Sequence, residues 1–109
     1  MLLNIDDRGA MQSNDGMSAP EAEVFGKTLR RIREARVPKL TQESLAHEAG
    51  ITTNFLSDLE RGRKVPSLTT ILQLAHALRI NPAELLADFT PAALRHIFDR
   101  PHRGTDVAR

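Results

Sequence analysis

Apolar residues recur at helical spacing along most of the chain. Phe25, Leu29 and Ile32 follow one another at i, i+4 and i+7, which is one face of a helix. Similar spacing predicts further helices around Leu45, Ala46 and Ala49; Phe55, Leu56 and Leu59; Leu68, Ile71, Leu72, Ala75 and Leu78; Leu85 and Leu86; and Leu94, Ile97 and Phe98. No alternating strand pattern appears, and we therefore expect an all-α fold.

Capping and breaking residues predict where these helices begin and end. Pro20 suits the first turn of a helix, and Val37-Pro38 ends that helix because a residue before proline is pushed out of the α region. Thr41 and Thr52 are good N-caps for the next two helices. The remaining signals are Gly50 and Gly62 at helix ends, and Pro66-Ser67, Asn81-Pro82 and Thr90-Pro91 at helix starts.

The same signals divide the chain into three parts. Residues 1–19 lack periodicity and are expected to form a flexible N-terminal arm. Residues 20–88 hold five helices, and residues 89–109 hold an additional helix and a loose polar tail. Within the domain, two helices of about eight residues are joined by Gly50-Ile51-Thr52. That spacing is typical of a helix-turn-helix, whose second helix enters the major groove of DNA, although a generic helical corner needs the same glycine.

Composition limits the classes of protein that need to be considered. A chain of 109 residues with 40% hydrophobic and 27% charged residues is typical of one small globular domain. The absence of cysteine excludes disulfides and cysteine-based zinc sites. No apolar run approaches the roughly 18 residues of a membrane span, and the N-terminus does not resemble a secretory signal. We therefore expect a cytoplasmic protein.

Charge is distributed unevenly along the chain. The formal net charge is only +1. Residues 1–23 carry −4, whereas residues 24–66 carry +4, with nine lysines and arginines against five acids. The positive part contains the two short helices, which is the pattern of a nucleic-acid surface, although a solvated face is the common alternative.

Residues that could carry catalysis or bind a metal are not arranged for either role. None of the histidines pairs with another at the i, i+4 spacing of a helical metal site; they are His47, His76, His96 and His102. Asp58 and Glu60 lie two apart on a helix and point to different sides, so they cannot act as an acid–base pair. We expect no enzyme activity, no cofactor and no metal.

The segment from Phe25 to Leu86 resembles the phage-repressor and Cro-like helix-turn-helix family, also called the xenobiotic-response-element family. The matching stretches are "LRRIR" (29–33), "LTQESLAHEAGI" (40–51), "FLSDLERGRKVPSL" (55–68) and "ILQLAHALRINPAELL" (71–86). The resemblance implies a five-helix lambda-repressor-like domain that binds double-stranded operator DNA, usually as a homodimer, and regulates transcription. The stretch "EARVPKL" is about two residues longer than is usual in the family, which leaves Lys39 either near a phosphate or in solvent.

The resemblance also implies which residues meet the bases. The helix beginning at Thr53 is the recognition helix, with Thr53, Asn54 and Asp58 at positions that reach base edges in relatives. Asparagine can bind adenine through two hydrogen bonds, threonine can meet a thymine methyl, and aspartate can accept from cytosine N4. The alternative for all three is that they are solvated polar residues on a helix, and Asp58 would in addition repel nearby phosphates. Phe55 either packs in the core or meets a thymine methyl.

Other positions of the family pattern imply phosphate contacts and one structural pair. The predicted phosphate-contacting residues are Gln42, Thr52, Arg61, Arg63 and Lys64. Arg33 and Glu60 match positions that form a buried or half-buried ion pair in relatives, which would fix the first helix to the recognition helix.

Two questions remain open from the sequence. The stripe Leu94, Ile97 and Phe98 either folds back on the core or forms a dimer interface. The main hypothesis is a sequence-specific transcriptional regulator acting as a homodimer on a palindromic operator. The alternatives are an antitoxin that also binds a toxin, a restriction-modification controller, and a protein-interaction module that has lost DNA binding.

Overall fold

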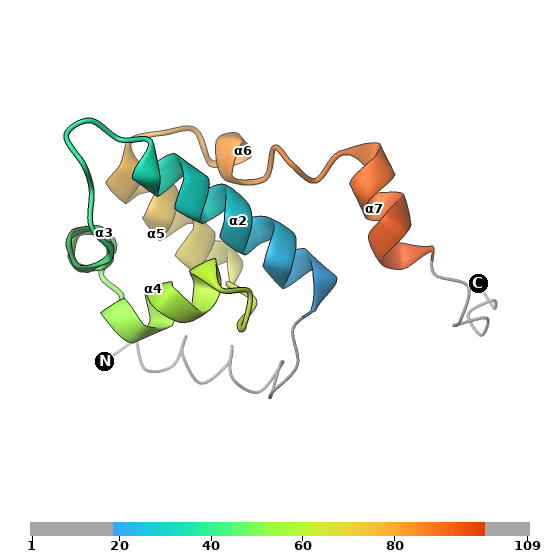
Figure 1. The fold of residues 1–109 in the computed structure, drawn as a ribbon, viewed down its shortest axis with the longest axis horizontal. Coiled ribbons are helices and arrows are strands. Elements are labelled where there is room, and N and C mark those ends of the chain that lie inside the picture. The colour runs from blue at the N-terminus through green and yellow to red at the C-terminus, as the bar shows by residue number, and fades with distance from the viewer. Residues whose placement is uncertain (1–18, 100–109) are drawn as a thin grey trace.

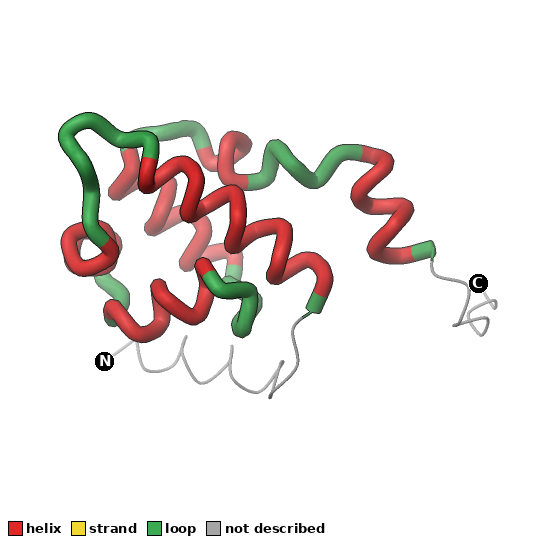
Figure 2. The backbone as a smooth tube through the Cα atoms, in the orientation of Figure 1, coloured by secondary structure: helices red, strands yellow, loops and turns green. Residues whose placement is uncertain are grey.

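The computed structural model describes residues 19–99, and all regular secondary structure within them is helical (Figures 1 and 2). The helices are α2 (Pro20–Glu34), α3 (Gln42–Ala49), α4 (Thr53–Glu60), α5 (Leu68–Leu78), α6 (Pro82–Leu85) and α7 (Pro91–Phe98). The predicted all-α class is therefore confirmed. None of the helices in this part of the chain combines the length and the apolar character needed to cross a bilayer.

Helices α2 to α6 form the bundle, and α7 stands outside it (Figure 1). The most extensive contacts between helices pair α2 with α4, α3 with both α4 and α5, and α6 with both α5 and α2. Helix α7 belongs to none of these pairs, and Figure 1 shows it beyond the connecting segment that follows α6. It is an appendage of the five-helix arrangement.

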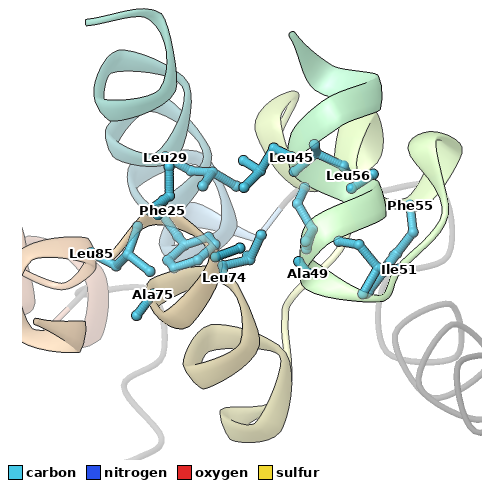
Figure 3. Packing of buried hydrophobic residues seen from close by; sticks show 14 residues of the cluster. Phe25, Leu29, Leu45, Ala49, Ile51, Phe55, Leu56, Leu74, Ala75 and Leu85 are labelled. Carbon is cyan, nitrogen blue, oxygen red and sulfur yellow. The ribbon is translucent and has the colours of Figure 1, made fainter. Parts of the chain in front are cut away.

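One hydrophobic core lies between the five helices (Figure 3). Each helix contributes at least one leucine that is fully buried, namely Leu29, Leu45, Leu56, Leu74 and Leu85. A buried leucine contributes roughly 1.5–3 kcal/mol relative to an exposed one, so this cluster supplies most of the force that holds short helices together. Since α3 and α4 have only eight residues each, they depend on this packing for their helical state.

The predicted caps begin the helices as the sequence indicates. A side-chain hydroxyl accepts a hydrogen bond from a backbone N–H three residues on at Thr41, Thr52, Ser67 and Thr90. The Asn81 side chain accepts one from Ala83. The end of the first helix differs slightly from expectation, because α2 stops at Glu34, before the bend that leads to Pro38.

The buried face of α5 matches the predicted stripe only in part, because Ala75 and Leu78 are buried and Ile71 is half-buried, but two of the predicted leucines face solvent. Leu68 and Leu72 are 69% and 47% exposed, whereas Leu74 and Leu78 are fully buried. The apolar stripe of α5 is wider than the surface that α3 and α6 cover, and periodicity alone cannot tell which edge of a wide stripe is covered.

Helix α2 lies exceptionally close to the end of α4 at Gly26. A β-carbon at this position would fall 2.7 Å from the carbonyl oxygen of Glu60 and even nearer to that of Leu59. Both obstacles are backbone atoms at the end of α4, so neither can rotate away as a side chain could. Glycine is therefore required here for the packing of two helices.

The segment after α6 is fastened to α2 by Asp88. The Thr28 hydroxyl donates to Asp88 Oδ2, and Arg31 Nη2 donates to the same oxygen at 3.1 Å. These two interactions hold the pKa of the Asp88 carboxyl below its usual value, the Thr28 hydrogen bond being the larger cause. These contacts with α2 fix the position of Asp88, shortly before α7 begins.

We predict that Gly26→Ala lowers the free energy of unfolding by about 2–3 kcal/mol, because the added methyl group forces α2 away from α4. Denaturant unfolding followed by circular dichroism measures the change. The matched control is Lys27→Ala at the next, exposed position, where we expect a change within about 0.5 kcal/mol. A Gly26→Ala protein as stable as its parent would contradict the close packing.

Candidate nucleic-acid interface

A tight corner sets the direction of α4. Gly50 adopts a left-handed conformation with φ of 78°, which ends α3, and its N–H donates to the carbonyl of His47. Ile51 then fills the inside of the corner and is only 6% exposed. The Thr52 hydroxyl starts α4 by accepting from Phe55 N at 3.0 Å. Figure 1 shows α3 almost end-on while α4 lies across the view, so the two helices cross steeply.

The inner side of α4 packs against the hydrophobic core. Phe55, Leu56 and Leu59 are each at most 2% exposed, and Figure 3 shows Phe55 and Leu56 pointing toward the other core residues. This decides between the two roles left open for Phe55, which packs in the core. The recognition helix predicted from the sequence is thus held by one face only.

The opposite side of α4 is polar and open to solvent. Thr53 and Asn54 are exposed, and Ser57 and Asp58 are half-buried. Arg61, the C-cap residue, is exposed as well. Sequence reasoning missed Ser57, although its position one turn after Thr53 places it on the same side of the helix.

Asp58 and Lys64 contact each other. Lys64 Nζ lies 3.2 Å from Asp58 Oδ2, and Arg61 Nη2 lies 3.9 Å from Asp58 Oδ1. The Lys64 side chain is only 18% exposed, and its amine also lies 5.7 Å from the centre of the Phe55 ring. Both residues were proposed to contact DNA, and in this structure their charged groups are directed toward one another.

The remaining predicted phosphate contacts lie near the start of α3 and beyond α4. Gln42, half-buried at the first position of α3, donates from Nε2 to Glu60 Oε1 at 2.9 Å. Thr52 is exposed, with its hydroxyl used as the cap of α4, and Arg63 is exposed in the turn after α4.

A hollow of about 650 Å³ runs between the start of α3 and the polar side of α4. Thr53, Ser57 and Arg61 line it from α4, and Thr41 and Gln42 line it from α3. Lys39, whose position the sequence left open, also lines this hollow. The lining holds four cations, Arg30, Arg33, Lys39 and Arg61, against three carboxylates, Glu34, Glu43 and Glu60, so its formal net charge is +1. The small positive excess and the backbone N–H groups at the start of α3 favour an anion.

Arg33 and Glu60 form a buried, two-pronged ion pair beneath this hollow. Arg33 Nε donates to Glu60 Oε2 at 2.6 Å, and Arg33 Nη2 donates to Glu60 Oε1 at 3.0 Å. The two side chains are 8% and 2% exposed. A third donor, Arg33 Nη1, bonds the carbonyl of Leu40 at 3.0 Å. The hydrogen bonds to Glu60 raise the pKa of the Arg33 guanidinium above its usual value, so Arg33 keeps its positive charge although it is buried.

Known proteins with a helix-turn-helix domain are similar to this chain in sequence and in fold. Residues 24–89 match the family described as the helix-turn-helix domain. The chain is 38% identical over 74 residues to the uncharacterized HTH-type transcriptional regulator y4dJ of Sinorhizobium fredii, a match covering 66% of this chain and 94% of that protein. It is 39% identical over 67 residues to the control protein C.BamHI of Bacillus amyloliquefaciens, covering 62% of this chain and 80% of that protein. The crystal structure of the restriction-modification controller protein C.AhdI from Aeromonas hydrophila superposes with a TM-score of 0.56 at 40% identity, covering 60% of this chain and 96% of that one.

The chain therefore belongs to the helix-turn-helix domain family. It is a DNA-binding regulator of the class that its resemblance to repressors and controllers implied. Family membership extends over α2 to α6, whereas α7 lies beyond the matched residues.

We predict that Glu60→Ala lowers the free energy of unfolding by about 3–5 kcal/mol, because it leaves the Arg33 charge buried without a partner. The matched comparison is the double variant Arg33→Met/Glu60→Leu, which removes both charges and should lose less stability than Glu60→Ala alone. Thermal and denaturant unfolding measure both. Equal melting temperatures for Glu60→Ala and its parent would refute the structural importance of the pair.

Proposed function

We propose that this protein represses or activates transcription as a homodimer that binds a palindromic operator through the major groove. The observation that supports the proposal is the polar side of α4, which stays open to solvent while the opposite side is buried. A helix held in this way can enter a groove about 12 Å wide without disturbing the bundle. Because the target is genomic DNA, we place the protein in the cytoplasm.

Base recognition is assigned first to the exposed start of α4. Thr53 and Asn54 are its first two residues, and recognition helices meet base edges with their N-terminal residues. Asn54 suits adenine through two hydrogen bonds, and Thr53 suits either a hydroxyl contact or a thymine methyl. Both are exposed, so neither must leave the core to reach DNA.

We assign phosphate binding to residues that line the hollow or flank α4. Gln42 keeps a second amide hydrogen free after its bond to Glu60, and it lies at the start of α3, where the helix dipole attracts anions. Lys39 lines the same hollow. Thr52, just before α4, and Arg63, in the turn after it, are both exposed. Contacts of this kind position the protein without reading sequence.

Dimerisation is assigned to α7. Leu94 and Phe98 on one side of this helix are 40% and 69% exposed, whereas Ile97 is buried. An eight-residue helix is too short to be stable in water without packing, and α7 has no extensive contact with another described helix. A second copy of the chain would cover the apolar side and place two α4 helices about 34 Å apart on successive major grooves.

A restriction-modification controller is the second candidate function. It is favoured by the similarity to the control protein C.BamHI and to the restriction-modification controller protein C.AhdI. The two candidates share the DNA interface and differ in the genes that the operator precedes. The binding site found by selection would distinguish them if it preceded the gene for a restriction nuclease or its methyltransferase. The antitoxin alternative stays a prediction, and a toxin that co-purifies with the protein would support it.

We predict that selection from random duplex DNA yields a palindromic consensus. Affinity for that sequence should fall by about 10³–10⁵ between about 50 and 200 mM salt if each dimer neutralises six to ten phosphates. Electrophoretic mobility shift or fluorescence anisotropy over this salt range measures the slope. Weak duplex binding that is insensitive to salt would instead indicate a protein-interaction module, and an asymmetric consensus would contradict a two-fold dimer.

For the dimer, we predict that Leu94→Ser/Phe98→Ser weakens self-association at least about tenfold, because exposed apolar side chains at an interface centre carry much of its energy. Sedimentation equilibrium measures the association constant. The control is Leu72→Ser, which changes a similarly exposed leucine on α5 and should leave the dimer unchanged. An unaltered dimer in the α7 variant would exclude this helix from the interface.

A further inference from the structure

Viewed along the helix axis, the middle of the open side of α4 is occupied by Ser57, Asn54 and the C-cap residue Arg61. Successive residues of a helix are about 100° apart, so the residues outside the core span one arc of the helix. Thr53 lies at one edge of that arc and Asp58 at the other, with Ser57, Arg61 and Asn54 between them. A helix that presents this arc to DNA therefore presents Arg61 centrally.

The Arg61 guanidinium lies back along α4. Side chains of a helix lean toward its N-terminus, and Arg61 Nη2 approaches Asp58 Oδ1, one turn earlier in the helix, at 3.9 Å. Arg61 also lines the hollow together with Thr53 and Ser57. Its side chain is 54% exposed. The charged group is thus beside the polar side of the helix, where base edges would lie, and not beyond its end among the flanking phosphates.

Asp58 is poorly placed to read a base itself. Each of its carboxylate oxygens faces a cation, Oδ1 toward Arg61 and Oδ2 toward Lys64, and the side chain is 23% exposed. Accepting a hydrogen bond from cytosine would require the loss of one of these contacts. The group of three carries a net charge of +1, so it attracts DNA as a whole despite the carboxylate.

We propose that Arg61 reads a guanine in the major groove and that Asp58 is a positioning residue that holds the Arg61 guanidinium toward that base. Arginine can donate two parallel hydrogen bonds to guanine O6 and N7. Its planar group has five N–H donors, so one edge can face Asp58 while others face the base. Ser57, small and one turn before Arg61, leaves room for the base to approach. This inference rests on the proposed DNA-binding function.

The test is Arg61→Lys, because lysine keeps the positive charge and loses the fixed pair of donors. Affinities are measured for the selected operator and for operators with each base pair changed in turn. We expect Arg61→Lys to reduce discrimination at one G·C pair per half-site by about 5- to 150-fold while the salt dependence stays unchanged. If Arg61→Lys keeps full discrimination at every position, Arg61 binds phosphate only and the inference is overturned.

Asp58→Asn tests the positioning role separately. It should relax preference at the same G·C pair as Arg61→Lys, to a smaller extent, because the guanidinium is less firmly held. Relaxation at a different pair, with cytosine on the strand that α4 faces, would show that Asp58 reads a base itself and would overturn the positioning role. An Asp58→Asn protein that keeps the parent's preference at every base pair would also overturn the positioning role.

A matched control variant and the parent protein distinguish a failure of this inference from a failure of the proposed function. Arg79→Lys makes the same change at an exposed arginine at the end of α5, outside the proposed interface, and should alter neither affinity nor preference. Melting temperatures of all variants confirm folding. If the parent protein shows no salt-dependent binding to the selected duplex, the proposed function fails. If the parent binds selectively and Arg61→Lys behaves like Arg79→Lys, only the present inference fails.

Discussion

The buried ion pair between Arg33 and Glu60 fixes the end of α4 against α2, after the corner at Gly50 has set its direction. It joins α2 to the last residue of α4, and the same two side chains bond the Leu40 carbonyl and the Gln42 amide. Helix α2, the end of α4 and the segment from Leu40 to Gln42 are therefore all hydrogen-bonded through this ion pair. Replacing such a pair by apolar residues often costs little, whereas breaking it costs much. We interpret its value as directional, because the forked hydrogen bonds allow one relative position of the two helices and apolar packing allows several.

The division of α4 into two sides explains how a small domain can hold a DNA-reading surface. An eight-residue helix needs tertiary contacts to persist, and α4 obtains them from one face through Phe55, Leu56 and Leu59. The other face contributes little to folding, so its residues can be suited to DNA. The cluster of Asp58, Arg61 and Lys64 is the exception, since its members contact one another before any ligand is present.

Local signals predicted the helices and the corner well, and long-range packing much less well. Hydroxyl caps and left-handed glycines act within a few residues, so Thr41, Gly50 and Thr52 could be identified from their neighbours alone. By contrast, Gly26 looks like an ordinary residue of α2 until α4 is placed beside it. Leu72 belongs to a correct periodic stripe, yet it faces solvent because no helix covers that edge.

The amino-acid sequence by itself determined the number of helices within residues 19–99, most of their starts, and the polar character of the side of α4 that faces outward. These properties follow from capping, spacing and amphipathic pattern, which operate over one or two helical turns. Only the tertiary structure decided that Asp58 is engaged by Arg61 and Lys64, that Gln42 bonds Glu60, and that α7 lies outside the bundle. Those outcomes depend on which side-chain atoms come within hydrogen-bonding distance once the core has closed, and spacing along a chain does not contain that information.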